Sequence, residues 1–191
     1  MTTQLILASS SPRRRELLTQ IGIDYKVQPI NIDERVLENE LPSEYIRRIS
    51  EQKARSARAL LNTHLPILAA DTAVVLDNTI IMGKPENYTD AYAMLQQLSG
   101  KVHKVYSGVF LLGKAAHYAV NITQVQFKLL TDNQIKAYCE TNEPYDKAGS
   151  YAIQGLAAIF IETISGSFSG VMGLPLFETS QLLAREGIIV L

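Results

Sequence analysis

The sequence predicts an α/β fold: a single compact, two-lobed domain over residues 1–191, built on an elongated mixed β-sheet flanked by helices, with a cleft between the lobes. Short apolar runs rich in β-branched residues alternate with segments of helical periodicity, which is the pattern of an α/β protein. Two long strand-like runs flank a short turn and indicate a large hairpin. The length of 191 residues, 47% of them apolar, suits one domain with a substantial core.

The elements follow in order from their turn and capping signals. Strands are expected over residues 4–8, 25–29, 67–70, 101–112, 117–130 and 156–164, with a further hairpin over 74–81 around the Asp77-Asn78 turn. Helices are expected over residues 12–21, 43–62, 88–98 and 175–185, with one more after Thr131. The irregular segments between these elements carry the unusual residues, and functional groups concentrate in such segments.

An anion site is expected directly after the first strand, where residues 9–15 read Ser-Ser-Ser-Pro-Arg-Arg-Arg. Ser11 is the expected N-cap and Pro12 the first helical residue. Arg13 and Arg14 then occupy the first turn, where the helix dipole disfavours a cation by about 0.3–1 kcal/mol. Free amides, hydroxyls and guanidinium groups at this point make a phosphate site. The alternative is that the arginines are solvated surface charge.

Charged residues also stand at positions that should face inward. Lys53 falls on the stripe of the second helix formed by Ile46, Ile49, Ala57 and Leu60, so we expect it to point toward a carboxylate or a phosphate. Snorkelling from the edge of the apolar face is the alternative. Asp71 comes where the apolar run of residues 67–70 stops, a position suited to a general base or a metal ligand, and a turn or helix cap is its alternative.

A turn-rich segment over residues 143–155 is expected to be a recognition loop. It holds a proline, a close Asp146-Lys147 pair and Gln154, whose amide offers a donor and an acceptor suited to one edge of a base. A plain structural loop is the alternative. Glu34 and Lys84 add charge beside turns and would count as solvated surface without further context.

Composition excludes several classes of protein. Eighteen basic against nineteen acidic residues give a net charge of −1, so no overall positive field favours nucleic acid. Cys139 is the only cysteine, expected as a small buried hydrophobe and consistent with a reducing compartment. Apolar runs are too short for a membrane span. We therefore expect a soluble, cytoplasmic protein without a nucleic-acid or membrane partner, whose oligomeric state stays open, a homodimer being one option.

Taken together, the motifs resemble those of the Maf family of nucleoside triphosphate pyrophosphatases, in its dTTP/UTP pyrophosphatase branch. The resemblance spans residues 5 to about 185, and its motifs are Ser9 to Arg14, Asp33-Glu34, Lys53-Ala54, Ala69 to Thr72, Gly83 to Pro85, Gly100 to His103, Asp146 to Tyr151, Ile153 to Gly155 and Val171 to Leu176. It implies that Gln154 marks the pyrimidine branch, where a methylated-GTP branch has Glu. Some relatives carry Glu at the position of Gly83, so no metal or base role is transferred to it.

The resemblance also implies roles for residues of this chain. Arg13, Thr72 and Gln154 match specificity positions, and Asp71 matches the proton acceptor. As a mechanism we expect Ser11, Arg13 and Arg14 to hold the triphosphate, with Lys53 and Lys84 adding positive charge. Glu34 and Asp71 would hold a divalent cation, Mg²⁺ or Mn²⁺.

Two other functions stay open at this stage. One is a nucleotide-binding regulator of cell division without significant turnover, which would share the phosphate site but would not need Glu34 and Asp71 beside it. The other is a single-stranded RNA binder, which the net charge and an aromatic content of 7% disfavour.

Overall fold

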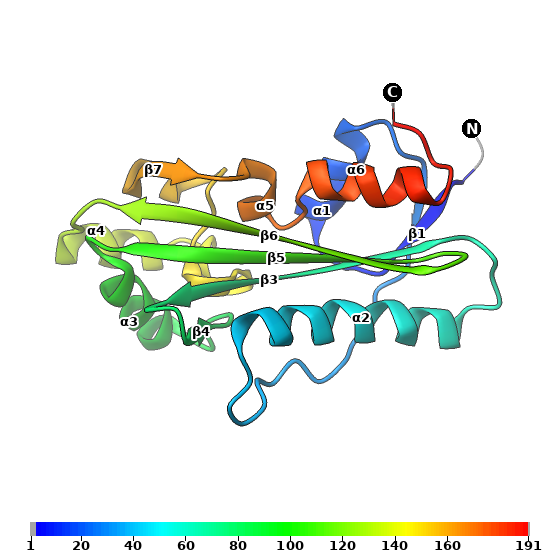
Figure 1. Ribbon diagram of the computed structural model, residues 1–191. Coiled ribbons are helices and arrows are strands. Elements are labelled where there is room, and N and C mark those ends of the chain that lie inside the picture. The colour runs from blue at the N-terminus through cyan, green and yellow to red at the C-terminus, as the bar shows by residue number, and fades with distance from the viewer. Residues whose placement is uncertain (1–2, 191) are drawn as a thin grey trace.

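Three long strands form the centre of the molecule. A computed structural model describes residues 3–190; residues 1, 2 and 191 of the expected domain lie outside that part. In it β3 (Ile67–Leu76), β5 (Val102–Leu112) and β6 (Ala116–Phe127) run side by side along the length of the molecule (Figure 1). Both neighbouring pairs are antiparallel, and β5 and β6 form the large hairpin that the sequence predicted.

Shorter strands complete a mixed, seven-stranded sheet. Its order is β2-β1-β3-β5-β6-β7, with β4 beside β3, and only the two pairs made by β1 are parallel. The short strands are β1 (Leu5–Leu7), β2 (Tyr25–Val27), β4 (Ile80–Met82) and β7 (Ile161–Ser165). Asp77 and Asn78, with φ of 50° and 64°, make the expected turn between β3 and β4. The predicted α/β class and the mixed sheet are confirmed.

Helices cover both faces of this sheet (Figure 1). The helices are α1 (Pro12–Gln20), α2 (Pro42–Leu60), α3 (Tyr88–Leu98), α4 (Asp132–Cys139), α5 (Phe168–Met172) and α6 (Leu176–Arg185). At one end, α2 packs on one face through Ala54 and Ala57, and α1 and α6 pack on the other around Leu18 and Leu183. None of the helices in the described part of the chain is both long and apolar enough to cross a membrane.

The opposite end of the sheet has a separate core. There α3 and α4 pack with β5 and β6 around Leu95, Phe127 and Phe160. Cys139 is buried in this cluster, as expected for a small hydrophobe. Three 3₁₀ turns, η1 (Pro144–Asp146), η2 (Ala148–Ser150) and η3 (Leu156–Phe160), connect α4 to β7. The separate cores give the two lobes.

Several sequence expectations were wrong in their limits. Residues 67–70 were expected to end a strand, but β3 continues to Leu76 because β5 pairs with it from Ile67 to Val75. Residues 156–160 form η3 rather than strand, and α5 was expected as loop. Leu60 was placed on the inner stripe of α2, yet it is 70% exposed at the last residue of that helix.

Candidate active site

One cleft of about 320 Å³ lies between the lobes and is lined by residues from eight segments of the chain. All nine residues proposed from the sequence line it: Ser11, Arg13, Arg14, Glu34, Lys53, Asp71, Thr72, Lys84 and Gln154. The structure thus brings the predicted residues together, while their individual roles remain predictions.

The cleft opens at an interruption in the pairing of β3. Strand β1 pairs with β3 only as far as Leu68, and β4 pairs with it only from Val74. Between these points, on the edge away from β5, no strand within residues 3–190 covers β3. Asp71 and Thr72 lie in this interval and point to opposite faces of the sheet, because side chains alternate along a strand. Both still line the cleft, since the uncovered edge is open to both faces.

Lys53 forms the charged centre on the α2 side of β3. Its Nζ lies 2.7 Å from Asp71 Oδ1 and 2.8 Å from Glu34 Oε1. The prediction that Lys53 points toward a carboxylate is therefore confirmed. The side chains of Lys53 and Asp71 are each 9% exposed, whereas that of Glu34 is 39% exposed. Burial alone would raise the pKa of Glu34, but the hydrogen bond and charge of Lys53 outweigh it and hold that pKa below its ordinary value.

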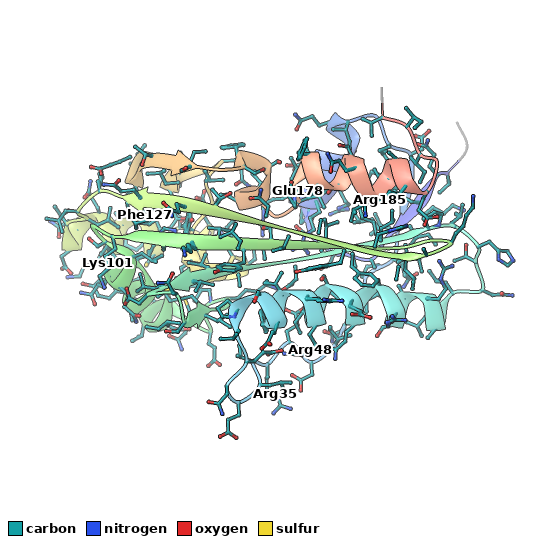
Figure 2. All side chains as sticks on the ribbon, viewed as in Figure 1. Arg35, Arg48, Lys101, Phe127, Glu178 and Arg185 are labelled. Atoms are coloured by element: carbon teal, nitrogen blue, oxygen red, sulfur yellow. The ribbon has the colours of Figure 1, made fainter. Side chains whose placement is uncertain are left out.

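The loop that carries Glu34 is fastened to α2 by residues that sequence reasoning did not select. Tyr45 donates its hydroxyl to the Glu34 carbonyl at 3.1 Å. Arg48 binds Glu40 through Nε and Nη2 at 2.5 and 2.6 Å, and also donates to the Arg35 carbonyl at 3.0 Å. Arg48 and Arg35 lie together beneath α2 in Figure 2. These contacts hold Glu34 against Lys53, and only the helical position of Tyr45 and Arg48 after an acidic loop could have suggested them.

The turn after β1 and the first turn of α1 line the cleft. Ser11 is the N-cap and Pro12 the first helical residue, as predicted, but the Ser11 hydroxyl makes no cap hydrogen bond. Instead its backbone N–H donates to the Ser9 hydroxyl at 3.1 Å. The first-turn amides have no partner within the helix, which is the condition for binding an anion there.

Arg14 and Arg13 make different contacts. Arg14 donates to the Gly173 carbonyl at 2.8 Å, to Ser9 Oγ at 3.3 Å and to Thr72 Oγ1 at 3.4 Å, so it joins α1 to the loop before α6. Burial lowers the pKa of Arg14 below its ordinary value. Arg13 instead binds Asp146 at 3.0 Å across the cleft, a contact exposed on the Asp146 side. Its guanidinium is therefore the freer of the two to meet a ligand.

The opposite wall comes from the segment over residues 143–155. Gly149 has φ of 67°, its N–H donates to the Gly83 carbonyl at 3.0 Å, and a Cβ there would lie 2.8 Å from Val74. This contact holds the segment beside the loop that carries Lys84. Lys147 binds Asp146 and the Glu143 carbonyl, so Asp146 and Lys147 belong to the wall although the sequence marked them only as a close pair. Gln154 is exposed on this wall.

The acidic residues fit a divalent cation only in part. Among residues 3–190 there is no group of three His, Cys, Asp or Glu side chains that could hold a metal ion. Glu34 and Asp71 converge on one ammonium group and offer oxygen ligands only. Mg²⁺ is commonly bound by one or two carboxylates, with the remaining ligands from substrate phosphates and water. This pair suits an ion that arrives with a phosphorylated ligand.

Comparison with known proteins places the chain in a family. The model of the family described as Maf-like protein matches residues 4–186, and the chain belongs to that family. It is 46% identical to a dTTP/UTP pyrophosphatase of Methylobacillus flagellatus, covering 98% of this chain and 95% of that protein. It is 47% identical to proteins of the same name from Bordetella avium, covering 97% and 96%, and from Pseudoalteromonas atlantica, covering 96% and 97%. Full-length similarity confirms the family resemblance that the motifs suggested.

Proposed function

We propose that this chain hydrolyses dTTP and UTP to the nucleoside monophosphate and pyrophosphate. The observation that carries the proposal is the cleft itself, in which a helix N-terminus, five basic side chains and the Asp71 carboxylate converge. Relatives named dTTP/UTP pyrophosphatase match nearly the whole chain at 46–47% identity, which supports the same substrates here. A cytoplasmic location and a homodimeric state remain predictions.

The basic groups account for triphosphate binding. The free amides of the first turn of α1 and the guanidinium of Arg13 bind the phosphates from one side. Lys84, exposed on the opposite rim, adds a second positive charge. Arg14 keeps the turn against Thr72 and Gly173, so it supports the phosphate site by holding its shape. The net charge of −1 means that this attraction is local to the cleft.

Asp71 is the group in this cleft best placed to accept a proton from an attacking water. It is buried on the uncovered edge of β3 and faces the cavity beside Lys53. Water then adds to the α phosphorus, the bond from that phosphorus to the bridging oxygen breaks, and pyrophosphate leaves. Lys53 neutralises negative charge at the same place, and such fixed charges in a site that excludes water commonly supply a large part of catalysis.

Glu34 and Asp71 are the residues that would hold a divalent cation, with Mg²⁺ or Mn²⁺ favoured by their oxygen ligands. The chemistry such an ion supplies is polarisation of a phosphoryl oxygen. Lys53 occupies the space between the two carboxylates and makes contact with both. We infer that Lys53 keeps the two oxygens together before the nucleotide binds.

Gln154 is the proposed reader of the base. Within the described part of the chain its amide makes no hydrogen bond, and the residue is exposed in the cleft. Thymine and uracil present an N3–H donor beside carbonyl acceptors, and a glutamine amide can satisfy one of each. Replacement by Gln154→Glu removes the amide donor, and we expect it to weaken the preference for pyrimidine nucleotides.

The direct test is Asp71→Asn, measured as pyrophosphate release from dTTP and UTP with added Mg²⁺ or Mn²⁺. Loss of a general base should lower turnover by about 10²–10⁴-fold while leaving the circular dichroism spectrum unchanged. Asp77→Asn is the matched control, because Asp77 lies in the β3–β4 turn outside the cleft and asparagine tolerates its φ of 50°. Unchanged turnover in Asp71→Asn would disprove the assignment. Nucleotide binding by the wild-type protein without any turnover would favour a regulator instead.

A further inference from the structure

Glu143 lies directly beneath the turn that carries Gln154. Its Oε2 accepts the Leu156 N–H at 2.9 Å, and its Oε1 accepts the Ala157 N–H at 3.2 Å. The Tyr138 hydroxyl also donates to Oε1, at 2.8 Å. Both carboxylate oxygens are thus occupied by donors, and the side chain connects α4 to the start of η3. Gln154 is only two residues from the first amide that Glu143 binds.

Gly155, which lies between Gln154 and Leu156, packs against the Glu143 carboxylate. A Cβ added to Gly155 would lie 2.3 Å from Glu143 Oε2 and 2.5 Å from Oε1, far inside van der Waals contact. The backbone of the turn therefore rests on the carboxylate, and a larger residue at position 155 would displace the carboxylate or the turn. A substitution of Glu143 or of Gly155 would move the Cα of Gln154 relative to the cleft.

The side chain that supports Glu143, that of Tyr138, is held in a rigid core. Tyr138 is 4% exposed, and its ring meets Phe160 edge to face at 5.2 Å within the core of this lobe. Burial, followed by the hydrogen bond to Glu143, raises the pKa of the Tyr138 hydroxyl above its ordinary value, so it remains a donor. The Glu143 carbonyl also accepts Lys147 Nζ at 2.7 Å. Glu143 consequently supports both the wall that carries Gln154 and the lysine beside Asp146.

Selection of a pyrimidine needs this kind of support. A glutamine amide carries its donor and acceptor side by side and can turn over, so by itself it pairs with either thymine or cytosine. Cytosine differs from thymine by presenting an amino donor where thymine presents a carbonyl acceptor. Discrimination therefore depends on where the amide is placed relative to the base, and the backbone of the turn determines that placement.

We propose that Glu143 is a positioning residue for nucleotide selection, holding Gln154 in register with the base through the Leu156 and Ala157 amides. The proposal rests on the function proposed above, in which Gln154 meets the base. Glu143 itself does not line the cleft. Substitution of Glu143 should change the relative rates for nucleotides with different bases more than the rate at which the triphosphate is hydrolysed.

Glu186 provides a matched control at the far end of the sheet. It accepts the Lys114 N–H at 2.9 Å and the Ala115 N–H at 3.2 Å, and a Cβ on Gly113 would lie 2.3 Å from its carboxylate. The backbone contacts match those of Glu143, with His117 Nε2 at 2.9 Å from Oε1 in place of the Tyr138 hydroxyl, but none of these residues lines the cleft. Glu186→Gln and Glu143→Gln should therefore lower the melting temperature to a similar extent.

The experiment compares kcat/KM for dTTP, UTP and dCTP in the wild type and these two full-length variants. Glu143→Gln should reduce the preference for dTTP over dCTP at least about tenfold, chiefly through KM, and Glu186→Gln should leave it unchanged. A wild-type preference retained in Glu143→Gln would overturn the inference. Should that variant fail to fold, Gly155→Ala carries the test, because its Cβ would push the Glu143 carboxylate and the turn apart, and an unchanged preference there is equally contrary.

The same measurements separate this inference from the function on which it rests. A wild-type protein that hydrolyses no nucleotide refutes the proposed function, and one that hydrolyses dTTP, UTP and dCTP alike refutes the base-reading role of Gln154 on which this inference rests. A selective wild type whose selectivity survives both Glu143→Gln and Gly155→Ala leaves that function standing and refutes only the positioning role.

Discussion

Removing the ammonium group of Lys53 tests whether the charged centre of the cleft is held as a coupled, buried unit. In Lys53→Met the side-chain volume is largely kept, but Asp71 loses its partner at 2.7 Å while remaining only 9% exposed. Breaking a buried pair by removing one member costs about 3–5 kcal/mol, because an uncompensated charge is left behind. Glu34, which is 39% exposed, can turn toward water and should add little to this cost.

Urea unfolding followed by circular dichroism gives the free energy of unfolding. In thermal unfolding the same loss should appear as a fall in melting temperature of roughly 6–20 °C. The double variant Lys53→Met/Asp71→Asn is the control, since it removes the stranded charge and should recover more than half of the loss. A single variant that costs less than about 1 kcal/mol would behave like an exposed ion pair and would refute the reasoning. The reasoning would also be refuted by a double variant whose loss of stability equals the sum of the losses in Lys53→Met and Asp71→Asn.

Two further predictions concern stability. Gly149→Ala should cost about 2–4 kcal/mol in urea unfolding, because its φ is 67° and its Cβ would collide with Val74. Gly22→Ala, with φ of 73° and open space around the Cβ, should show only the backbone cost of about 1–2 kcal/mol. Equal costs in the two variants would contradict the collision. Burial lowers the pKa of His103 from 6.5 to about 4, so below pH 6.5 the unfolded chain binds a proton that the folded protein does not. Stability should fall by about 3 kcal/mol between pH 6.5 and 4. His103→Gln should lack this component and the exposed His64→Gln should keep it, while parallel pH curves for all three proteins would rule it out.

Local signals made some elements predictable from the sequence. Helix α3 begins and ends as expected because its caps are local: the Asn87 side chain accepts the Asp90 N–H, and the chain turns at Ser99-Gly100, where φ of Gly100 is 68°. The β5–β6 hairpin was likewise predictable from two long apolar runs around one turn. In both cases the residues that decide the conformation are neighbours in the chain.

Long-range contacts decide the elements whose limits were wrong. The polar pair Asp71-Thr72 interrupts an apolar run and indicates a strand end, but pairing with β5 carries β3 through it. Residues 156–160 are apolar enough for a strand, yet the Glu143 carboxylate binds the Leu156 and Ala157 amides that a strand would need for its ladder. Neither partner is close in sequence, so periodicity alone could not reveal them.

The position of the cleft follows from these long-range contacts. Because β1 and β4 are both short, they leave the middle of one edge of β3 uncovered, while β5 keeps the other edge straight. A residue at an ordinary strand end reaches a ligand from one face of a sheet. Here adjacent side chains on opposite faces reach the same cavity: Asp71 with Lys53 on one side, and Thr72 with Arg14 on the other. The proposed proton acceptor, Asp71, and the phosphate-binding turn can therefore contact one ligand from opposite faces of a rigid strand.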